Sequence, residues 1–345
     1  MKESKLNLTE KWSYIAAVNT FFFALACTIT IFLVRQHTAA SREFYFWDNI
    51  GYYNIAIEML DRFRTISTLD FLRDLYHSFS DEISNLFALP LLPFLSVLGT
   101  SRFDFIISLA LSYLLPAVFL TSWLCSVFVQ QKKLIIFWGT VFTLLLSPFC
   151  WAAILDGRPD IGGVMLLLLP VLVATNFIFS KAGVSKFVLI GLCLALLPLF
   201  RRSFLVTVAA FFIAWAITEL VVGEKLGFSF KTAIKKLKGP IIAVIAWGLF
   251  MLSIGYPFLR RYILNDVMQH YSSYLFVEDR GWKVVSLFTL SFYSVPLLLF
   301  SVVGLIGGIK KTSSDRRTLK LAWLALLFLG AYTCLLFYWA DKWSN

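Results

Sequence analysis

The stretch "SYIAAVNTFFFALACTITIFLV", residues 13–34, decides the fold class, because it is long and apolar enough to cross a lipid bilayer as a helix. A hydrocarbon core of about 30 Å needs about 20 mostly apolar residues. The whole chain has the same character, with 59% hydrophobic residues, 17% aromatic residues and a mean hydropathy of +0.79 over 345 residues. Soluble domains are usually about 45–50% apolar. The apolar runs are continuous rather than alternating, so they predict an all-α polytopic membrane protein.

The apolar runs predict about nine to ten transmembrane helices in a single domain over residues 1–345. A further piece, "LFALPLLPFLSVLG" at 86–99, has 14 residues and two prolines, which is short for a crossing. We expect it to be re-entrant or interfacial, and the alternative, in which it crosses, inverts every later orientation. The nine expected spans are 13–34, 104–129, 134–152, 161–180, 187–200, 204–222, 240–257, 284–308 and 321–340.

The distribution of positive charge predicts the orientation. With 86–99 in a loop, one side of the membrane receives the N-terminus and short loops that carry 15 Lys and 2 Arg, whereas the other side receives 12 Arg and 2 Lys. The positive-inside rule makes the lysine-rich side, including 223–239, cytoplasmic. Arginine on the outer side suits bidentate recognition of phosphate or carboxylate, although it can also serve only as an interfacial anchor.

The large first outer loop, 35–103, contains the first candidate site. It holds "WDNIGYY", with Asp48 at the start of an amphipathic helical stretch, 48–63. In the expected helix, Ile50, Tyr53, Ile57, Leu60 and Phe63 share one face, and Asp48, Tyr52, Met59 and Arg62 share another. Such a helix lies flat on the membrane, with Asp48 where lipid head groups meet water. The alternative is that Asp48 only caps the helix.

Other charged residues fall at the same predicted face. Arg158 and Asp160 stand in "LDGRPDIGG", where an acid can equally complement the dipole of a helix start. Arg201 and Arg202 lie between two apolar runs with almost no loop, which is costly in a membrane unless they face a cavity. Arg260 can be an interfacial anchor and His270 an ordinary loop residue.

Several function classes find no support in the sequence. The net charge of +11 is spread over membrane loops, and no basic recognition helix or stacking motif indicates nucleic-acid binding. The five Cys lie in or beside the spans, and their spacing matches neither a zinc site nor a disulfide framework.

The order of these features resembles the GT-C fold of polyprenyl-phosphate-dependent glycosyltransferases. The features are an Asp soon after the first span, a Tyr-containing surface helix, a short Pro-containing apolar helix, and "GRPD" opening a later span. The chain is most similar to the family of protein O-mannosyltransferases and the lipid A aminoarabinose transferase, over residues 1 to about 300. The soluble C-terminal domain common in that fold is not expected here.

The resemblance implies roles for particular residues. Asp48 matches the acid taken to activate the acceptor, and Asp160 matches the acid that opens a later span. Arg202, or equally Arg201, matches a basic residue thought to touch the donor phosphate, and Tyr52, Arg158, Arg260 and His270 are further candidates for substrate binding. Asn49 stands where the family has a second acid, so a divalent cation stays possible but is not required.

The resemblance also implies partners and a location. The donor would be a polyprenyl-phosphate sugar, the acceptor a lipid, glycan or protein, and the site would face outward from a membrane. We expect a bacterial inner membrane with a cytoplasmic N-terminus. Two other classes stay open, namely a transporter or flippase for a lipid-linked or anionic substrate, and a non-catalytic membrane subunit.

Overall fold

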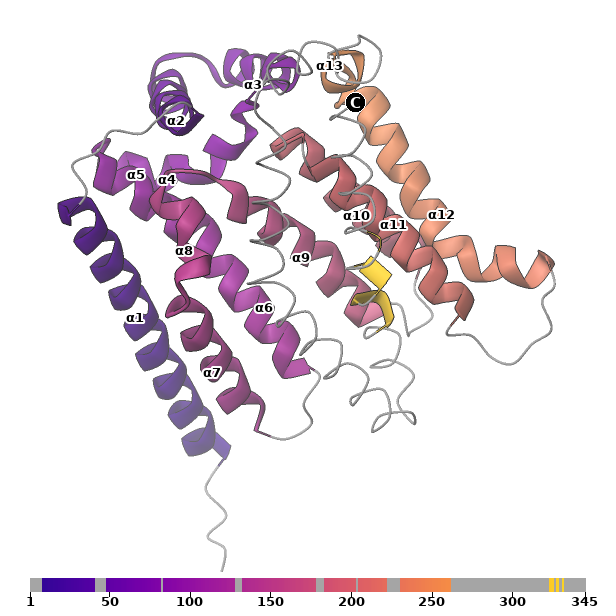
Figure 1. Ribbon diagram of the computed structural model, residues 1–345, viewed down its shortest axis with the longest axis horizontal. Helices are drawn as coiled ribbons and strands as arrows, with labels where there is room; N and C mark the ends of the chain where they lie inside the picture. Colours follow the sequence, from indigo (N-terminus) through magenta and orange to yellow (C-terminus); the bar gives the residue numbers. More distant parts are fainter. Residues whose placement is uncertain are drawn as a thin grey trace, which may run out of the picture. The chain divides into compact units, whose positions relative to one another are not determined.

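The computed structural model describes residues 8–40, 48–81, 83–127, 132–177, 183–202, 204–221, 230–261, 323–325, 327–328 and 331. Every regular element in this part of the chain is helical (Figure 1). In chain order the elements are α1 (Leu8–Ala40), α2 (Asp48–Thr65), α3 (Thr68–His77), η1 (Ser78–Ser80), η2 (Asn85–Leu91), α4 (Leu92–Leu98), α5 (Arg102–Leu109), η3 (Ala110–Leu114), α6 (Leu115–Val127), α7 (Lys133–Leu145), α8 (Pro148–Leu155), α9 (Asp160–Phe177), α10 (Val184–Phe200), α11 (Phe204–Val221), α12 (Phe230–Ser253) and α13 (Tyr256–Leu259).

Three helices in the described ranges are long and apolar enough to cross a membrane. They are Ser13–Ala40, Arg102–Val127 and Ile234–Ser253, and they coincide with three of the expected spans. The helices α9, α10 and α11 are apolar but shorter, with 18, 17 and 18 residues. The segment 86–99 forms η2 and α4, with seven residues each. The re-entrant or interfacial position of this segment stays a prediction.

The expected span 134–152 is divided in the structure. The helix α7 ends at Leu145, and α8 begins at Pro148. Ser147 between them has an extended backbone, with φ −82° and ψ 121°. A residue before proline is pushed out of the helical region by the proline ring, which explains the break. The expected spans 284–308 and 321–340 lie outside the described residues, except for six positions within 323–331.

The chain divides into two compact units, each described by itself below. Unit 1 comprises Met1–Phe71 and Phe87–Leu168, and unit 2 comprises Leu72–Leu86 and Leu169–Asn345. The expectation of a single domain over 1–345 stays a prediction.

The core of unit 1 is the continuous helix α5–η3–α6. Its middle, η3, is a single π-helical turn in which the Leu115 N–H donates to the Ala110 carbonyl. Pro116 follows at once and has no N–H to give, so a wider turn is a reasonable local solution. The turn presents two hydroxyls to η2: Ser112 donates to the Pro90 carbonyl at 2.8 Å, and Tyr113 donates to the Phe87 carbonyl. These bonds hold the proline-containing segment against the central helix.

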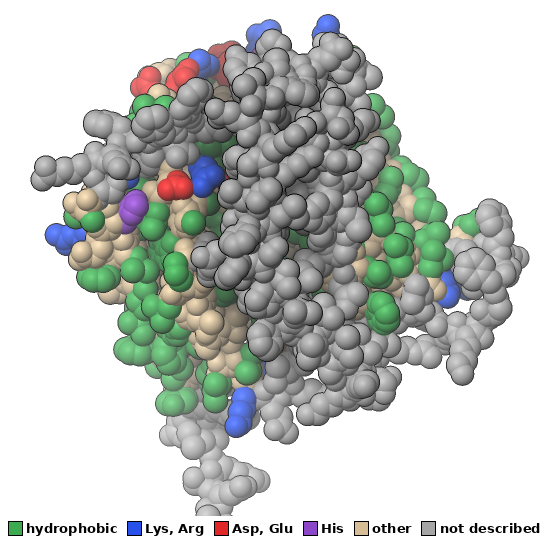
Figure 2. Space-filling model, viewed as in Figure 1, with side chains coloured by type: hydrophobic (Ala, Val, Ile, Leu, Met, Phe, Trp, Pro, Cys, Tyr) green, Lys and Arg blue, Asp and Glu red, His purple; other side chains and the backbone are tan. Residues whose placement is uncertain are grey.

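The helix α1 lies at the edge of unit 1. It contacts α5 and α7, where the Phe22 ring packs on Trp138 and the Trp138 indole donates to Asn19 Oδ1 at 2.9 Å. Large apolar side chains elsewhere on α1, including Phe21 and Phe32, are exposed, and Figure 2 shows hydrophobic side chains over this helix. An apolar surface of this kind suits contact with lipid.

The buried face of α2 differs from the expected one. Tyr52, Ala56 and Met59 are buried, whereas Ile50 and Phe63, expected on the apolar face, are exposed. The helix α2 buries this side because it packs on α4 and η2. The Tyr52 ring meets the Phe87 ring edge-on, with centroids 5.1 Å apart. The buried side chains of α2 therefore come from both expected faces, with Leu60 from the first and Tyr52 and Met59 from the second.

Unit 2 is built around α10 and α12, which pack closely on each other. A Cβ at Gly191 of α10 would clash with the Ala243 carbonyl of α12, and a Cβ at Gly239 of α12 would lie 2.8 Å from the Phe187 ring. Small residues let helix backbones approach in this way. Because residues 187 and 191 pair with 239 and 243, the two helices run parallel, and their C-terminal ends lie at the same level.

Candidate functional site

Asp48 is the first residue of α2, and its side chain lies outside the described residues. The position of its helix is well defined by the next turn. The Tyr53 hydroxyl donates to the Thr100 carbonyl at 2.6 Å, and its ring meets Phe105 edge-on. These contacts hold the N-terminal end of α2 against the beginning of α5. Tyr52, predicted to bind substrate, is only 4% exposed, and its ring belongs to the core of unit 1.

The "GRPD" sequence forms a tight turn between α8 and α9. The Gly157 N–H donates to the Ile154 carbonyl at 2.9 Å, and the Arg158 N–H donates to the Ala153 carbonyl at 2.8 Å. This pair of bonds is a Schellman motif, which requires a left-handed residue, and Gly157 supplies it with φ +82°. Pro159 then stops the first helix, and its carbonyl accepts from the Gly162 N–H of the second. The local sequence therefore fixes the backbone at Arg158 and Asp160.

Arg158 is partly tied to a neighbouring acid that the sequence reasoning missed. Its Nη2 donates to Asp156 Oδ2 at 2.8 Å, and both side chains remain partly exposed. Its Nε is buried and makes no hydrogen bond within the part of the chain that the structure describes. In the sequence, the acid two residues before the arginine in "DGR" indicates that Asp156 can pair with Arg158.

Asp160 begins α9 and is half-buried, so a carboxylate does open this helix as expected. It lies in the first turn, where a negative charge is favoured by the helix dipole. The way in which the neighbouring helices pack shows at which end of unit 1 Asp160 lies. Phe119 of α6 meets Phe137 and Trp138 of α7, and α8 continues in the direction of α7 against η3 and α5. The turn at 156–160 thus lies toward the end of unit 1 where α5 begins and where α2 is held.

In unit 2, Arg201 and Arg202 follow the C-terminal end of α10. The Arg201 backbone is extended, its N–H donates to the Leu197 carbonyl, and both arginines are half-buried. Their carbonyls accept from the first N–H groups of α11, so the turn between the helices is short. Arg260 is exposed just after α13, which follows α12. Since α10 and α12 run parallel, these three arginines lie at one end of unit 2. His270 lies outside the described residues.

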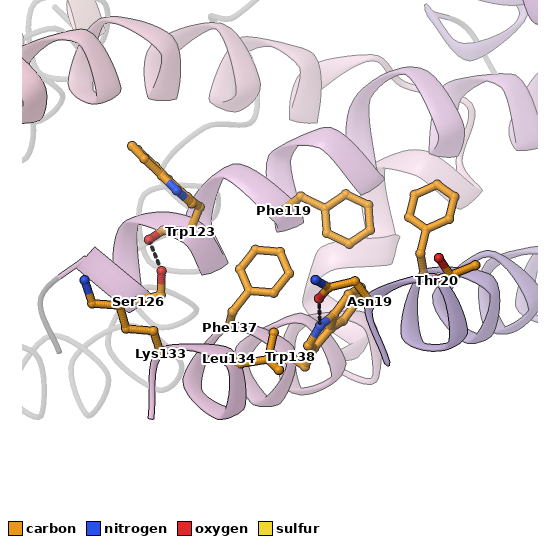
Figure 3. A pocket seen from close by; sticks show the side chains of 10 residues that line it. Asn19, Thr20, Phe119, Trp123, Ser126, Lys133, Leu134, Phe137 and Trp138 are labelled. Carbon is orange, nitrogen blue, oxygen red and sulfur yellow. Dashed lines mark hydrogen bonds between the residues drawn. The ribbon is translucent and has the colours of Figure 1, made fainter. Parts of the chain in front are cut away.

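A groove of about 740 Å³ occurs elsewhere in unit 1, between α1, α6 and α7 (Figure 3). Half of its lining residues are aromatic, among them Phe119, Phe137 and Trp138, and Lys133 lies at one end. None of the predicted site residues lines it.

Metal binding receives no direct support from the described part of the chain, which contains no group of three or more His, Cys, Asp or Glu suited to hold an ion. A divalent cation at the predicted site stays a prediction.

Comparison of the chain with protein-family models, with curated proteins and with solved structures finds no match.

Proposed function

We propose that the chain is an integral membrane glycosyltransferase with GT-C-like organisation, which moves a sugar from a polyprenyl-phosphate donor to an acceptor at the outer or luminal face. The long apolar helices support membrane insertion, and the charge distribution supports a cytoplasmic N-terminus. A bacterial inner membrane is the proposed location, and a lipid, glycan or protein the acceptor.

Arg158 provides the observation that favours phosphate chemistry most directly. A buried donor without an acceptor costs about 1–3 kcal/mol, so the Nε of Arg158 favours a ligand that brings an oxygen. A phosphate oxygen can accept from Nε, and arginine typically pairs such a contact with a second N–H of the same guanidinium. The Schellman turn fixes the backbone at Arg158, so binding a ligand there costs little backbone conformational entropy.

The proposed reaction assigns complementary roles to the acids. The bond between the sugar C1 and the phosphate oxygen breaks, and its electron pair leaves with the polyprenyl phosphate. A bond forms between C1 and the acceptor oxygen or nitrogen, whose proton passes to the Asp48 carboxylate. The transition state is oxocarbenium-like, and fixed arginines stabilise the departing phosphate. Asp160, at the start of α9, is the second catalytic acid in this proposal.

The arginines of unit 2 supply further candidates for the donor phosphate. Arg201 and Arg202 are half-buried at a short turn between two apolar helices, a place where charged residues in membrane proteins are rare and often functional. Arg260 at the same end of unit 2 extends the basic surface toward solvent.

The decisive experiment is sugar transfer by the purified full chain, reconstituted with a polyprenyl-phosphate donor carrying a labelled sugar. Arg158→Gln should weaken donor binding by roughly 10- to 100-fold, the equivalent of one charge-assisted contact. Arg158→Lys keeps the charge but loses the paired donors, so it should restore only part of the affinity. Arg62→Gln is the matched control, because Arg62 is tied to Glu58 at 2.7 Å on exposed α2. Equal donor affinity in the Arg158 and Arg62 variants would rule out the phosphate role.

A second variant tests Asp48. Asp48→Asn should lower turnover by roughly 10²- to 10⁴-fold with donor affinity almost unchanged, because the lost interaction belongs to the transition state. Asp61→Asn, an exposed acid on the same helix, is the control. If Asp48→Asn turns over at the normal rate, Asp48 is only a helix cap. Movement of the lipid-linked sugar across the bilayer without transfer would instead favour the transporter.

A further inference from the structure

The first part of α12 combines basic charge with an amphipathic pattern. Residues 230–239 contain four Lys and no acid, and they are followed by Pro240 within the same helix. Figure 1 shows α12 bending, with its first part turned away from the apolar remainder. A proline inside a helix is a common cause of such a bend, because it removes a hydrogen bond and its ring displaces a carbonyl.

The exposure of the side chains shows which way this segment faces. Lys235 and Lys238 are exposed and, three residues apart, lie on the same side of the helix. Ile234 is 49% exposed although it is large and apolar, and Leu237, three residues on, is half-buried beside it. An exposed isoleucine next to exposed lysines is the pattern of a helix that lies in the membrane interface, with its apolar side in the acyl boundary and its lysines among head groups.

Two contacts hold the segment in place on unit 2. The Lys236 ammonium donates to the Leu220 carbonyl near the end of α11, at 3.5 Å. Gly239 lies so close to the Phe187 ring of α10 that no side chain would fit there without movement. The second half of the segment is therefore attached to the helix bundle, and Lys235 and Lys238 remain exposed.

We propose that residues 230–239 form an in-plane helix that binds anionic phospholipid head groups, with Lys235 and Lys238 contacting the phosphate oxygens and Ile234 the acyl chains. Charge complementarity selects an anionic lipid over a zwitterionic one, since each lysine near such a surface contributes about 1 kcal/mol. The proposal rests on the membrane orientation proposed above but does not depend on sugar transfer.

The test uses the full chain in neutral detergent, titrated with phosphatidylglycerol or phosphatidylcholine, with bound lipid counted by native mass spectrometry. Lys235→Gln with Lys238→Gln should reduce phosphatidylglycerol affinity by roughly 25-fold, about fivefold for each lysine. Phosphatidylcholine affinity should not change. Lys235→Arg with Lys238→Arg should retain binding, which separates loss of charge from loss of folding.

The matched control is Lys132→Gln with Lys133→Gln, which removes two exposed lysines from the same predicted side of the membrane. It should leave phosphatidylglycerol affinity within twofold. An equal loss in both pairs would show a diffuse charge effect, and a loss in the control alone would indicate the groove that Lys133 lines. Either result, or equal binding of the two lipids, would overturn the proposal. Sugar transfer is not measured in this assay, so the two proposals fail separately.

Discussion

Two helices of unit 1 have almost the same hydropathy and opposite surroundings. The segment Ser13–Ala40 has 17% of its most apolar window buried inside the protein, whereas Arg102–Val127 has 67% buried. Among the described elements, the first packs mainly on α5 and α7, and the second is contacted by α1, η2, α4, α7 and α8. Apolar composition therefore shows that a helix can enter a membrane, but its neighbours determine whether it faces lipid or protein.

The largest difference is expected between Phe105 and Phe32. Phe105 of α5 is fully buried, so Phe105→Ala should lower the free energy of unfolding by about 3–5 kcal/mol through lost contacts and a cavity. Phe32 of α1 is 57% exposed, and Phe32→Ala should cost much less, because lipid can fill the space. Reversible unfolding in mixed detergent measures both. Similar losses would mean that α1 is as well packed as α5–α6 and would break the comparison.

An intermediate effect is expected at Tyr113. Tyr113→Phe leaves the Phe87 carbonyl without its hydroxyl donor in a buried place, at a cost of about 1–3 kcal/mol. The exposed Tyr14 of α1 is the control, and Tyr14→Phe should be nearly neutral. The same unfolding measurement applies, together with proteolysis of the segment 85–98, which should become faster only in the first variant. Unchanged proteolysis would show that the hydroxyl does not hold η2.

The smallest effect concerns the attachment of α1. Trp138→Phe removes the hydrogen bond to Asn19 but keeps an aromatic ring against Phe22, so the loss should be about 0.5–1.5 kcal/mol. Trp123→Phe on α6 is the control, since Trp123 is partly exposed. Reversible unfolding in mixed detergent measures the loss in both variants. A larger loss in unfolding free energy for Trp138→Phe than for Tyr113→Phe would mean that the attachment of α1 contributes more to stability than the contacts of the central helix, which would contradict the comparison.

The sequence predicted where the helices lie more reliably than how they face. Continuous apolar runs located Ser13–Ala40 and Arg102–Val127, because a run of this length has few other structures available. The break before Pro148 was also predictable, since "SP" disfavours a helical serine, but the apolar run concealed it. The buried face of α2 was not predictable, because both faces carry apolar side chains and the position of Phe87 decides between them.

The candidate site was predictable in part. A carboxylate at the start of α9 and arginines after α10 follow from charges flanking apolar runs. The Schellman turn could have been predicted from Gly157 and Pro159, which together indicate the end of a helix. The burial of Arg158 Nε could not be inferred, since it depends on side chains that approach from other elements.

The π-turn at 110–114 has a consequence for the rotation of the central helix. A π-turn amounts to one residue inserted into an α-helix, and one residue corresponds to about 100° of rotation. The side of α6 that meets α7 is thus offset from the side it would present if the helix continued regularly from α5. Within this continuous helix, the α5 half that packs on α4 and the α6 half that packs on α7 are phased separately, so the residues that make the two contacts need not follow one helical face in the sequence. Because the turn holds the extra residue, deletion of one residue within 110–114 would leave a regular α-helix with both halves still facing their partners, whereas a deletion farther along α6 would rotate the rest of that helix away from α7.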